Sequence, residues 1–337
     1  MANFNNDINK SNHPLVSFCL FAYNQEKYIR EAVEGALNQT YIPLEIILSD
    51  DFSTDNTFQI IKEMCINYKG PHTLILNRNK QNMGIGGHYS KIIEMSHGEF
   101  ILSAAGDDIS HSQRAEIMVR EWEKSNYKKH VLFHSGRRSI NSLSDILNEV
   151  YEPKYSEIVN YPELLIKNGA YATGCTIGYP KTLYEFYGPL HDGILNEDAA
   201  LTFRASLLDG VILIKELLVD YRVGIGIGSL NNIKLSKDEK INFKYKHTEY
   251  LLHLFEQYLK DFKRSGNKSK KIEIMIIQDL NNKKALMYGI ENNLFKVIKK
   301  LFFFIHEKVS LKIILFIILF NIFKSFGVNR IPNILLR

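Results

Sequence analysis

The sequence contains little cysteine, and its cysteines form no pattern that predicts a cross-link. The 337 residues include three cysteines, Cys19, Cys65 and Cys175, which lie far apart and form no CxxC pair. A structural zinc site and a disulfide framework are therefore not expected. Cys19 lies within an apolar run, where a small buried hydrophobe is the simplest interpretation. Such usage is typical of a reducing compartment.

Long hydrophobic runs are also missing. The first apolar stretch, at 15–23, and the last, at 313–323, are shorter than the roughly 20 residues that span a bilayer. The N-terminus lacks the charged-then-apolar pattern of a signal peptide. We therefore expect a cytoplasmic protein body.

Most of the chain lacks an excess of charge of either sign. The net charge is +5, but residues 294–337 hold eight Lys or Arg and one acid, so residues 1–293 sum to −2. Nucleic-acid binding through general basicity is therefore not expected. The basic, apolar tail suits an interfacial helix at a membrane surface. The alternative is a helical hairpin packed on the body or in a dimer.

The common signatures of several enzyme classes are missing as well. The glycines at 84–87 and 224–228 form neither GxGxxG after the first strand nor GxxxxGK[ST]. HExxH, GxSxG and DFG are also absent. The usual dinucleotide-binding and P-loop sites are therefore not indicated.

Apolar runs and amphipathic stretches alternate over the first 110 residues. The runs predict strands at 15–21, 44–48, 73–76 and 100–102, with helical patterns between them. This alternation predicts an α/β fold with a mostly parallel sheet covered by helices. Further along, we expect a loop-rich insertion at 135–160, strands at 211–214 and 216–223, helices from 236 onward and a basic linker at 263–271.

Polar side chains follow three of the predicted strands. These are Tyr23-Asn24, Asp50-Asp51 and Asp107-Asp108. Ligands of open α/β sheets bind outside the carboxyl ends of the strands, so these residues are candidates for a site. Paired acids there either bind a divalent cation or form turns and helix caps.

Another pair of acids begins a later helical pattern. Glu197 and Asp198 stand where an acid either interacts favourably with the helix dipole or acts as a general base. Both interpretations remain open on the residues alone.

The order of the motifs resembles the family 2 glycosyltransferases, which are inverting enzymes with the GT-A fold. Residues 16–29 resemble that family's first strand and helix, and 44–57 resemble its second strand and DDGSTD-like signature. Similar segments follow in the family's order: Asn82-Met83-Gly84, 98–101, 173–175, 196–198 with Arg204-Ala205, and 217–222. The resemblance covers residues 14–230.

The resemblance implies a nucleotide-diphospho-sugar transferase fold with a C-terminal helical extension. The implied organisation is a flexible N-terminus at 1–13 and a GT-A catalytic domain at 14–230. That domain would divide into a nucleotide-binding half at 14–110 and an acceptor half at 111–230. Residues 231–337 would form the helical extension with its basic amphipathic, membrane-associated tail.

The resemblance also implies roles for residues at the strand ends. Phe21 and Tyr23 would border the nucleotide, and Asp51 would hold the base or ribose. Asp107 would lie near the ribose or metal, and Asp108 would be the main contact of Mg²⁺ or Mn²⁺.

Asp198 matches the family's catalytic base. It would take the proton of an acceptor hydroxyl that displaces a nucleoside diphosphate from its sugar with inversion, an EC 2.4 reaction. The implied setting is cell-surface polysaccharide or glycan biosynthesis at the inner face of the cell membrane. The implied acceptor is a glycan or lipid-linked glycan, and the oligomeric state is left open. The alternative is a non-catalytic nucleotide-sugar-binding or scaffold protein on the same fold.

Three departures from the family pattern bear on these roles. Ala105 replaces the first acid of the common Asp-x-Asp-Asp run, and Phe52 replaces the glycine of the DDGSTD-like turn. Gly224 stands near the position where many members carry a histidine. A nucleotidyltransferase is a further alternative, but it would need a basic, glycine-rich phosphate loop near the first strand, and this chain has none there.

Overall fold

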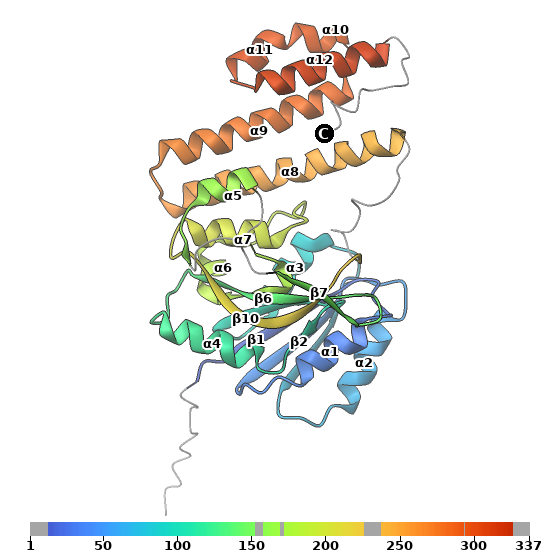
Figure 1. Cartoon of the computed structure of the whole chain (residues 1–337), viewed down its shortest axis with the longest axis vertical. Coiled ribbons are helices and arrows are strands. Elements are labelled where there is room, and N and C mark those ends of the chain that lie inside the picture. The colour runs from blue at the N-terminus through green and yellow to red at the C-terminus, as the bar shows by residue number, and fades with distance from the viewer. Residues whose placement is uncertain (1–12, 152–157, 169–171, 226–236, 293, 326–337) are drawn as a thin grey trace, which may run out of the picture.

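The computed structural model describes residues 13–151, 158–168, 172–225, 237–292 and 294–325. The predicted flexible N-terminus, apart from residue 13, and the end of the tail lie outside these residues. Within them, strands and helices alternate from the start of the sheet, as the apolar pattern predicts (Figure 1). The sheet forms one layer of the body, and the C-terminal helices are stacked beyond one of its faces.

The first half of the sheet is parallel and matches the prediction. The strands are β1 (Val16–Ala22), β2 (Leu44–Asp50), β3 (Thr73–Arg78) and β4 (Phe100–Ala105), with β1 between β2 and β4, and β3 beyond β2. The connecting helices are α1 (Ile29–Leu37), α2 (Thr57–Asn67) and α3 (Gly84–Met95). Helices α1 and α2 pack on one face and α3 on the other, which is why β1 and β2 are almost wholly buried.

Beyond β4 the sheet is mixed, with the overall order β3-β2-β1-β4-β9-β6-β10-β5. The additional strands are β5 (Ile109–Ser110), β6 (Leu132–Ile140), β7 (Ile146–Tyr151), β8 (Ile158–Val159), β9 (Ile177–Pro180) and β10 (Val211–Arg222). β6 and β7 form an antiparallel pair, so the loop-rich insertion expected at 135–160 is wrong over its described residues. Polar residues in β6 such as Ser135, Arg137 and Arg138 conceal the strand from an apolar pattern.

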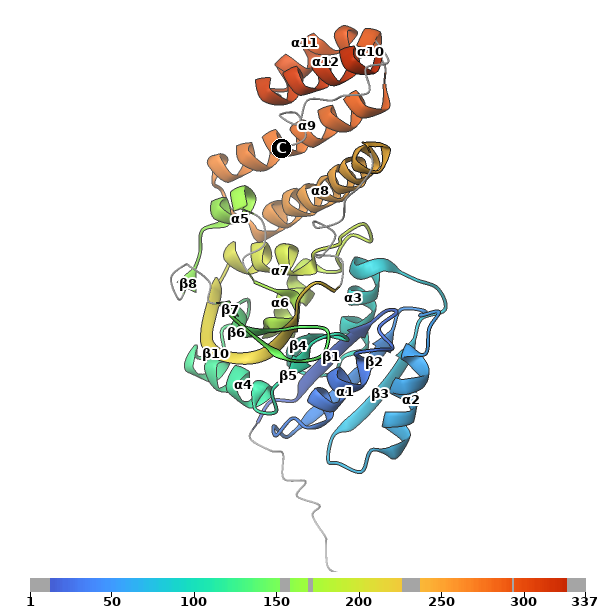
Figure 2. The ribbon, with the colours of Figure 1, turned by 45° about the vertical axis from the view of Figure 1, so that its right-hand side comes forward.

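Strand β10 is continuous where two strands are predicted. Its pairing with β6 shifts register between Ile214 and Leu217 and again between Leu217 and Val219. The exposed pair Lys215-Glu216 lies at this irregularity and interrupts the apolar pattern. Bulges bend a strand, and β10 curves visibly across the sheet (Figure 2).

Four helices and a 3₁₀ turn accompany the second half of the sheet. They are α4 (Arg114–Lys124), α5 (Pro162–Asn168), η1 (Gly174–Thr176), α6 (Lys181–Tyr187) and α7 (Glu197–Ser206). The acids Glu197 and Asp198 form the first turn of α7, as predicted.

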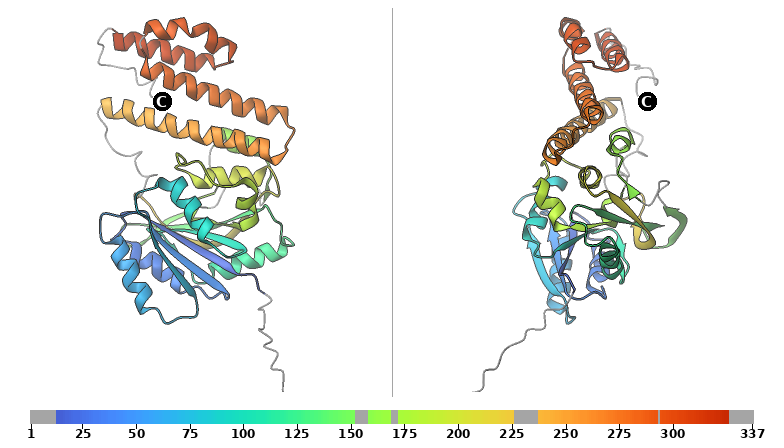
Figure 3. Two further views of the ribbon diagram at one scale, coloured as in Figure 1. Left: turned by 180° about the vertical axis from the view of Figure 1, so that it is seen from behind. Right: turned by 90° about the vertical axis from the view of Figure 1, so that its left-hand side faces the viewer.

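The C-terminal part is helical from residue 237 to residue 325. Its helices are α8 (Lys237–Ser265), α9 (Lys270–Glu291), α10 (Leu294–Lys299), α11 (Leu301–His306) and α12 (Leu311–Ser325). The basic linker expected at 263–271 is shorter, at 266–269, because α8 continues to Ser265 and α9 begins at Lys270. Gly266, at φ +71°, allows the turn between them, and the Ser269 hydroxyl caps α9. Figure 3 shows α8 lying against the part that contains the sheet and α9–α12 continuing away from it.

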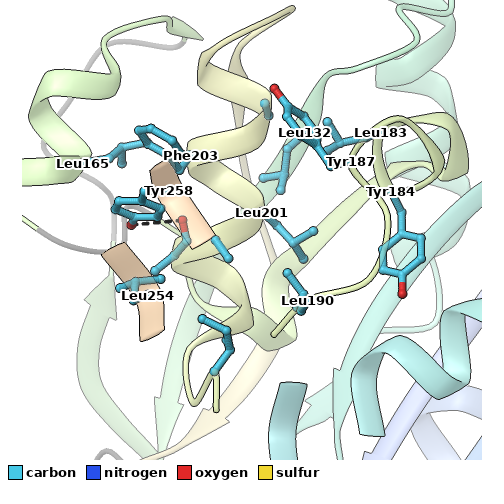
Figure 4. Close-up of a cluster of buried hydrophobic side chains, with 14 of the residues drawn as sticks. Leu132, Leu165, Leu183, Tyr184, Tyr187, Leu190, Leu201, Phe203, Leu254 and Tyr258 are labelled. Atoms are coloured by element: carbon cyan, nitrogen blue, oxygen red, sulfur yellow. Dashed lines mark hydrogen bonds between the residues drawn. The ribbon is translucent and has the colours of Figure 1, made fainter. Parts of the chain in front are cut away.

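Helices α8 and α9 share a hydrophobic core with the body. Leu132 of β6 and Phe203 of α7 belong to the same buried cluster as Leu254 and Tyr258 of α8 and Ile276 of α9 (Figure 4). Burial of apolar side chains is the main favourable term in folding. These two helices therefore help to stabilise the body, rather than forming a separate unit.

The tail helix α12 packs on α9 within a smaller core. Ile314, Ile317 and Phe320 are buried, and the Asn321 amide donates to the Gly289 carbonyl at 2.8 Å. A side chain at Gly289 would meet Ile317. This face of α12 is therefore packed on a neighbouring helix, as in the alternative of a packed helical hairpin. In the part of the chain that is described, no helix is both long and apolar enough to cross a membrane.

Candidate active site

Asp51 lies directly after β2 and is held by the protein on both its backbone and its side chain. Its N–H donates to the Ala22 carbonyl at the end of β1, at 2.9 Å. Its Oδ1 accepts from the Asn79 amide at 2.7 Å and from the Met83 N–H at 2.9 Å. The carboxyl is therefore fixed at the edge between β1 and β3. Sequence reasoning did not single out Asn79, which is one residue past the end of β3.

Phe21 and Tyr23 are placed differently from one another. The half-buried Phe21 ring stacks on Tyr89 at 4.9 Å and meets His88 edge-on at 5.5 Å, so it belongs to the packed wall of the sheet edge. Tyr23, two residues later, is 46% exposed. Of the two aromatic rings proposed to border a nucleotide, Tyr23 presents the larger accessible surface.

The turn Asp107-Asp108 follows β4 and is held by Arg222 at the end of β10. The Arg222 N–H donates to Asp108 Oδ1 at 2.8 Å, and its Nε donates to the Asp107 carbonyl at 2.9 Å. The guanidinium is fully buried, and it also donates to Glu31 at 2.5 Å and to the Asn141 carbonyl at 2.8 Å. The turn is therefore tied to both β10 and α1.

Burial is the main influence on the two acids of this turn. Burial first and the neighbouring Asp107 carboxylate second raise the pKa of Asp108 to about 7, although the Arg222 N–H and the Cys175 thiol limit the rise. Burial also raises the pKa of Asp107, against a hydrogen bond from Gln25. Two desolvated carboxyls side by side favour a proton or a cation between them. A role for these acids in capping a helix is disfavoured, because β5 rather than a helix follows the turn.

The carboxyls of this turn could supply only part of the coordination shell of a hard divalent cation. Among the described residues, no group of three or more His, Cys, Asp or Glu could enclose a metal ion. Magnesium commonly uses one or two protein carboxylates, with water and substrate phosphate as the other ligands. Asp108, with Asp107 beside it, suits that mode, and Ala105 supplies no third acid.

Asp198 lies at the start of α7 and accepts two backbone hydrogen bonds. Its Oδ2 accepts from the Gly174 N–H at 3.1 Å and its Oδ1 from the Ala199 N–H at 2.7 Å. Desolvation raises the pKa of Asp198 to about 6, and these N–H groups limit the rise. The neighbouring Glu197 has its pKa raised to about 8, first by desolvation and then by Asp198.

Cys175 links the two acidic groups of the site. The Cys175 thiol lowers the pKa of Asp108, while the N–H of the adjacent Gly174 donates to Asp198 Oδ2 at 3.1 Å. The η1 turn thus joins the end of β4 to the start of α7. Arg137 of β6 also acts on the pKa of Asp108, and its guanidinium lies 3.8 Å from the Tyr221 ring centroid. Neither Arg137 nor Arg222 is among the site residues predicted from the sequence.

The first half of the chain matches a known protein family. Residues 17–184 match the profile described as Glycosyl transferase family 2. The chain belongs to this family. The matched region runs from β1 into α6 and includes the Asp51 and Asp107-Asp108 turns.

Named relatives match this chain over part of their length. The chondroitin synthase of Escherichia coli is 36% identical over 111 residues, which are 33% of this chain and 16% of that protein. The putative glycosyltransferase EpsE of Bacillus subtilis is 34% identical over 114 residues, 34% of this chain and 40% of EpsE. The chain thus spans a minor part of the length of these relatives.

Solved structures share the fold at low sequence identity. S. aureus TarS 1–349 in complex with UDP superposes with a TM-score of 0.57 at 14% identity, over 93% of this chain and 88% of that one. The mannosyltransferase PcManGT from Pyrobaculum calidifontis, in complex with GDP-Man and Mn²⁺, gives 0.51 at 13% identity, over 84% and 77%. The fold of this chain is therefore the GT-A glycosyltransferase fold, with C-terminal helices attached.

Proposed function

We propose that the protein transfers a sugar from a nucleoside-diphosphate-sugar to a hydroxyl acceptor, with inversion at the anomeric carbon. The observation that carries the proposal is that the η1 turn touches both acids: the Gly174 N–H donates to Asp198 Oδ2 at 3.1 Å, and the adjacent Cys175 thiol acts on the pKa of Asp108. A cation–diphosphate group at the acidic turn and a carboxylate that removes a proton would then share one site. Family membership supports the same assignment.

On the donor side, Asp51 would contact the base or ribose, with Phe21 and Tyr23 at the border of the nucleotide. Asp107 would lie beside the ribose or the metal, and Asp108 would hold Mg²⁺ or Mn²⁺. When bound, such a cation neutralises charge on the departing diphosphate. The UDP of TarS and the GDP-Man and Mn²⁺ of PcManGT support this choice of ligands.

On the acceptor side, Asp198 would remove the proton of the attacking hydroxyl. A general base works best when its pKa is close to the working pH, and a pKa of about 6 leaves Asp198 ionised at neutral pH yet basic enough to accept a proton. One displacement from the face opposite the leaving group inverts the anomeric configuration.

We further propose that the acceptor is a glycan or lipid-linked glycan of a cell-envelope polysaccharide, and that the tail rests on the inner face of the membrane. The polysaccharide-synthase names of relatives support the acceptor class. Exposed apolar side chains on the last three helices support the proposed membrane binding. They are Phe295, Ile298, Phe303, Ile305, Leu311 and Leu315. Lysines stand among them in the sequence, which suits anionic lipid.

A thermal-shift screen of nucleotide sugars with Mn²⁺ tests donor binding, because a ligand of the native state raises its melting temperature. We expect a shift with at least one nucleoside-diphosphate-sugar, and a smaller one for Asp108→Asn. A screen without any shift would contradict the proposed donor class. A protein that binds a donor but never turns it over would instead be the non-catalytic binding protein on this fold.

A further inference from the structure

Helix α8 holds helix α7, which carries Asp198, near both of its ends. Near the start of α7, the Tyr258 hydroxyl donates to the Ala199 carbonyl at 3.3 Å. The Tyr258 ring stacks on Phe203 with 4.0 Å between centroids, and both rings lie at the α7–α8 contact in Figure 4. Near the end of α7, Arg204 Nε donates to Asp261 Oδ2 at 2.8 Å.

The Arg204–Asp261 pair is fully buried and its atoms have further partners. Arg204 also donates to the Gly188 carbonyl at 2.9 Å, and Asp261 Oδ1 accepts from the Gln257 amide at 2.8 Å. A buried ion pair adds little net stability but strongly favours one geometry, because any displacement leaves a charge without its partner. The pair therefore fixes the position of α7 against α8.

Gln257 extends the same contact to the loop that leads into α7. Its Oε1 accepts from the His191 N–H at 3.0 Å. Further along this loop, the Ile194 carbonyl accepts from the Gly86 N–H of α3 at 3.0 Å. One stretch of α8 thus holds both the helix that carries Asp198 and the loop before that helix, which hydrogen bonds to the first turn of α3.

We propose that Tyr258 and Asp261 of α8 are positioning residues that hold α7 where the Asp198 carboxylate can take the acceptor proton. The inference rests on the proposed function and extends it, because it makes the C-terminal helices part of the catalytic machinery. Displacing a catalytic group by about 1 Å can cost about 100-fold in rate. A small shift of α7 is therefore enough to matter.

The pH dependence of the reaction reports on this positioning. Backbone N–H groups of Gly174 and Ala199 stabilise the ionised form of Asp198. The titratable groups that face it are Glu197 of α7 and Tyr250 and Tyr258 of α8. A shift of α7 that lengthens the hydrogen bond from the Gly174 N–H raises the pKa of Asp198, so the acid limb of the rate profile moves to higher pH.

The test compares Tyr258→Leu, Tyr258→Phe and Asp261→Asn in the full chain. The readout is release of UDP from UDP-GlcNAc, or of GDP from GDP-mannose, with Mn²⁺ across a pH series. For Tyr258→Leu we expect kcat to fall about tenfold or more, with an unchanged donor KM and an acid limb at higher pH. Tyr258→Phe keeps the stacked ring and should recover most of the rate. Lys263→Gln, at an exposed position of the same helix, should match the wild type.

Asp261→Asn extends the test to the other end of α7 and should change kcat and the acid limb in the same direction. Where Tyr258→Leu fails to fold, Asp261→Asn decides, with a lower kcat and an acid limb at higher pH. Folded Tyr258→Leu or Asp261→Asn with a wild-type kcat and acid limb would overturn the inference, as would an equal loss of kcat and donor affinity. A wild-type protein that turns over no nucleotide sugar would overturn the proposed function instead.

Discussion

The main-chain N–H of Arg222 donates to Oδ1 of Asp108 at 2.8 Å, although the two residues are 114 positions apart in the chain. Through this contact the end of β10 fixes the acidic turn that follows β4. The Arg222 side chain adds bonds to the Asp107 carbonyl and to Glu31. The geometry of the proposed metal–diphosphate site therefore depends on a strand from the other half of the fold.

Replacing Arg222 with Met should destabilise the protein and weaken donor binding. The main-chain bond to Asp108 persists, but the Asp107 carbonyl, the Asn141 carbonyl and Glu31 each lose one donor. The Glu31 side chain is 42% exposed, which moderates the loss. We expect a decrease of about 2–3 kcal/mol in the free energy of unfolding, measured by urea denaturation. Arg120→Met removes only exposed ion pairs and should change it by less than about 1 kcal/mol. Equal effects of both substitutions would contradict the role of Arg222.

The rate of sugar transfer should fall at low pH as Asp198 becomes protonated. Its pKa of about 6 lies above the ordinary value for aspartate because the carboxyl is desolvated. Below that pH the rate should fall about tenfold per pH unit, whereas near neutral pH it should be nearly constant. Initial rates over a pH series at saturating donor measure the limb. A rate that stays level well below this range would show that another group is the base.

Stability should fall as pH rises through the titration of Glu197. Because the pKa of Glu197 in the folded protein, about 8, lies above its ordinary value of 4.5, the folded state holds this proton more tightly than the unfolded state. The associated stability is present below about pH 4.5 and is lost by about pH 8. Glu197→Gln cannot titrate, so its free energy of unfolding should decrease less than that of the wild type between these pH values. Parallel pH dependences of the two proteins in urea denaturation would refute the assignment.

The exposed apolar surface of α12 should contribute to membrane binding. Leu311 and Leu315 lie one helical turn apart and are 79% and 57% exposed. The double substitution to Ser should reduce cosedimentation with vesicles of anionic lipid, because burial of apolar surface in the interface is lost. Ile274→Ser with Ile277→Ser, on exposed positions of α9, is the matched control and should bind as the wild type does. Wild-type protein that stays in the supernatant would exclude the membrane role.

Much of the nucleotide-binding half can be predicted from the sequence, because its signals are local. Buried parallel strands appear as apolar runs, and the acids follow those runs directly. Phe52, which replaces the glycine of the DDGSTD-like turn, still adopts a positive φ of +65°, the conformation that favours glycine. The cost of that conformation could not be read from residue types alone.

The other parts of the fold and of the candidate site depend on contacts between segments that are distant in the chain. Arg222 and Asp108, or Arg204 and Asp261, carry no local sign of their pairing, and each pair forms only when separate strands or helices pack. Strand β6 was missed because several of its buried residues, such as His134, Ser135 and Ser139, are polar. The contribution of α8 to the core could not be predicted either, because an amphipathic helix does not specify the surface that it covers.

The most direct test of the account compares nucleotide release by three proteins at neutral pH. Wild type, Asp198→Asn and the control Asp279→Asn of α9 would be given UDP-GlcNAc or GDP-mannose with Mn²⁺, and donor affinity would be measured in parallel by calorimetry. We predict equal donor affinity for all three, and a rate for Asp198→Asn at least about 100-fold below the other two. Turnover by Asp198→Asn at the wild-type rate would contradict the assignment of Asp198 as the base, and with it the proposed mechanism.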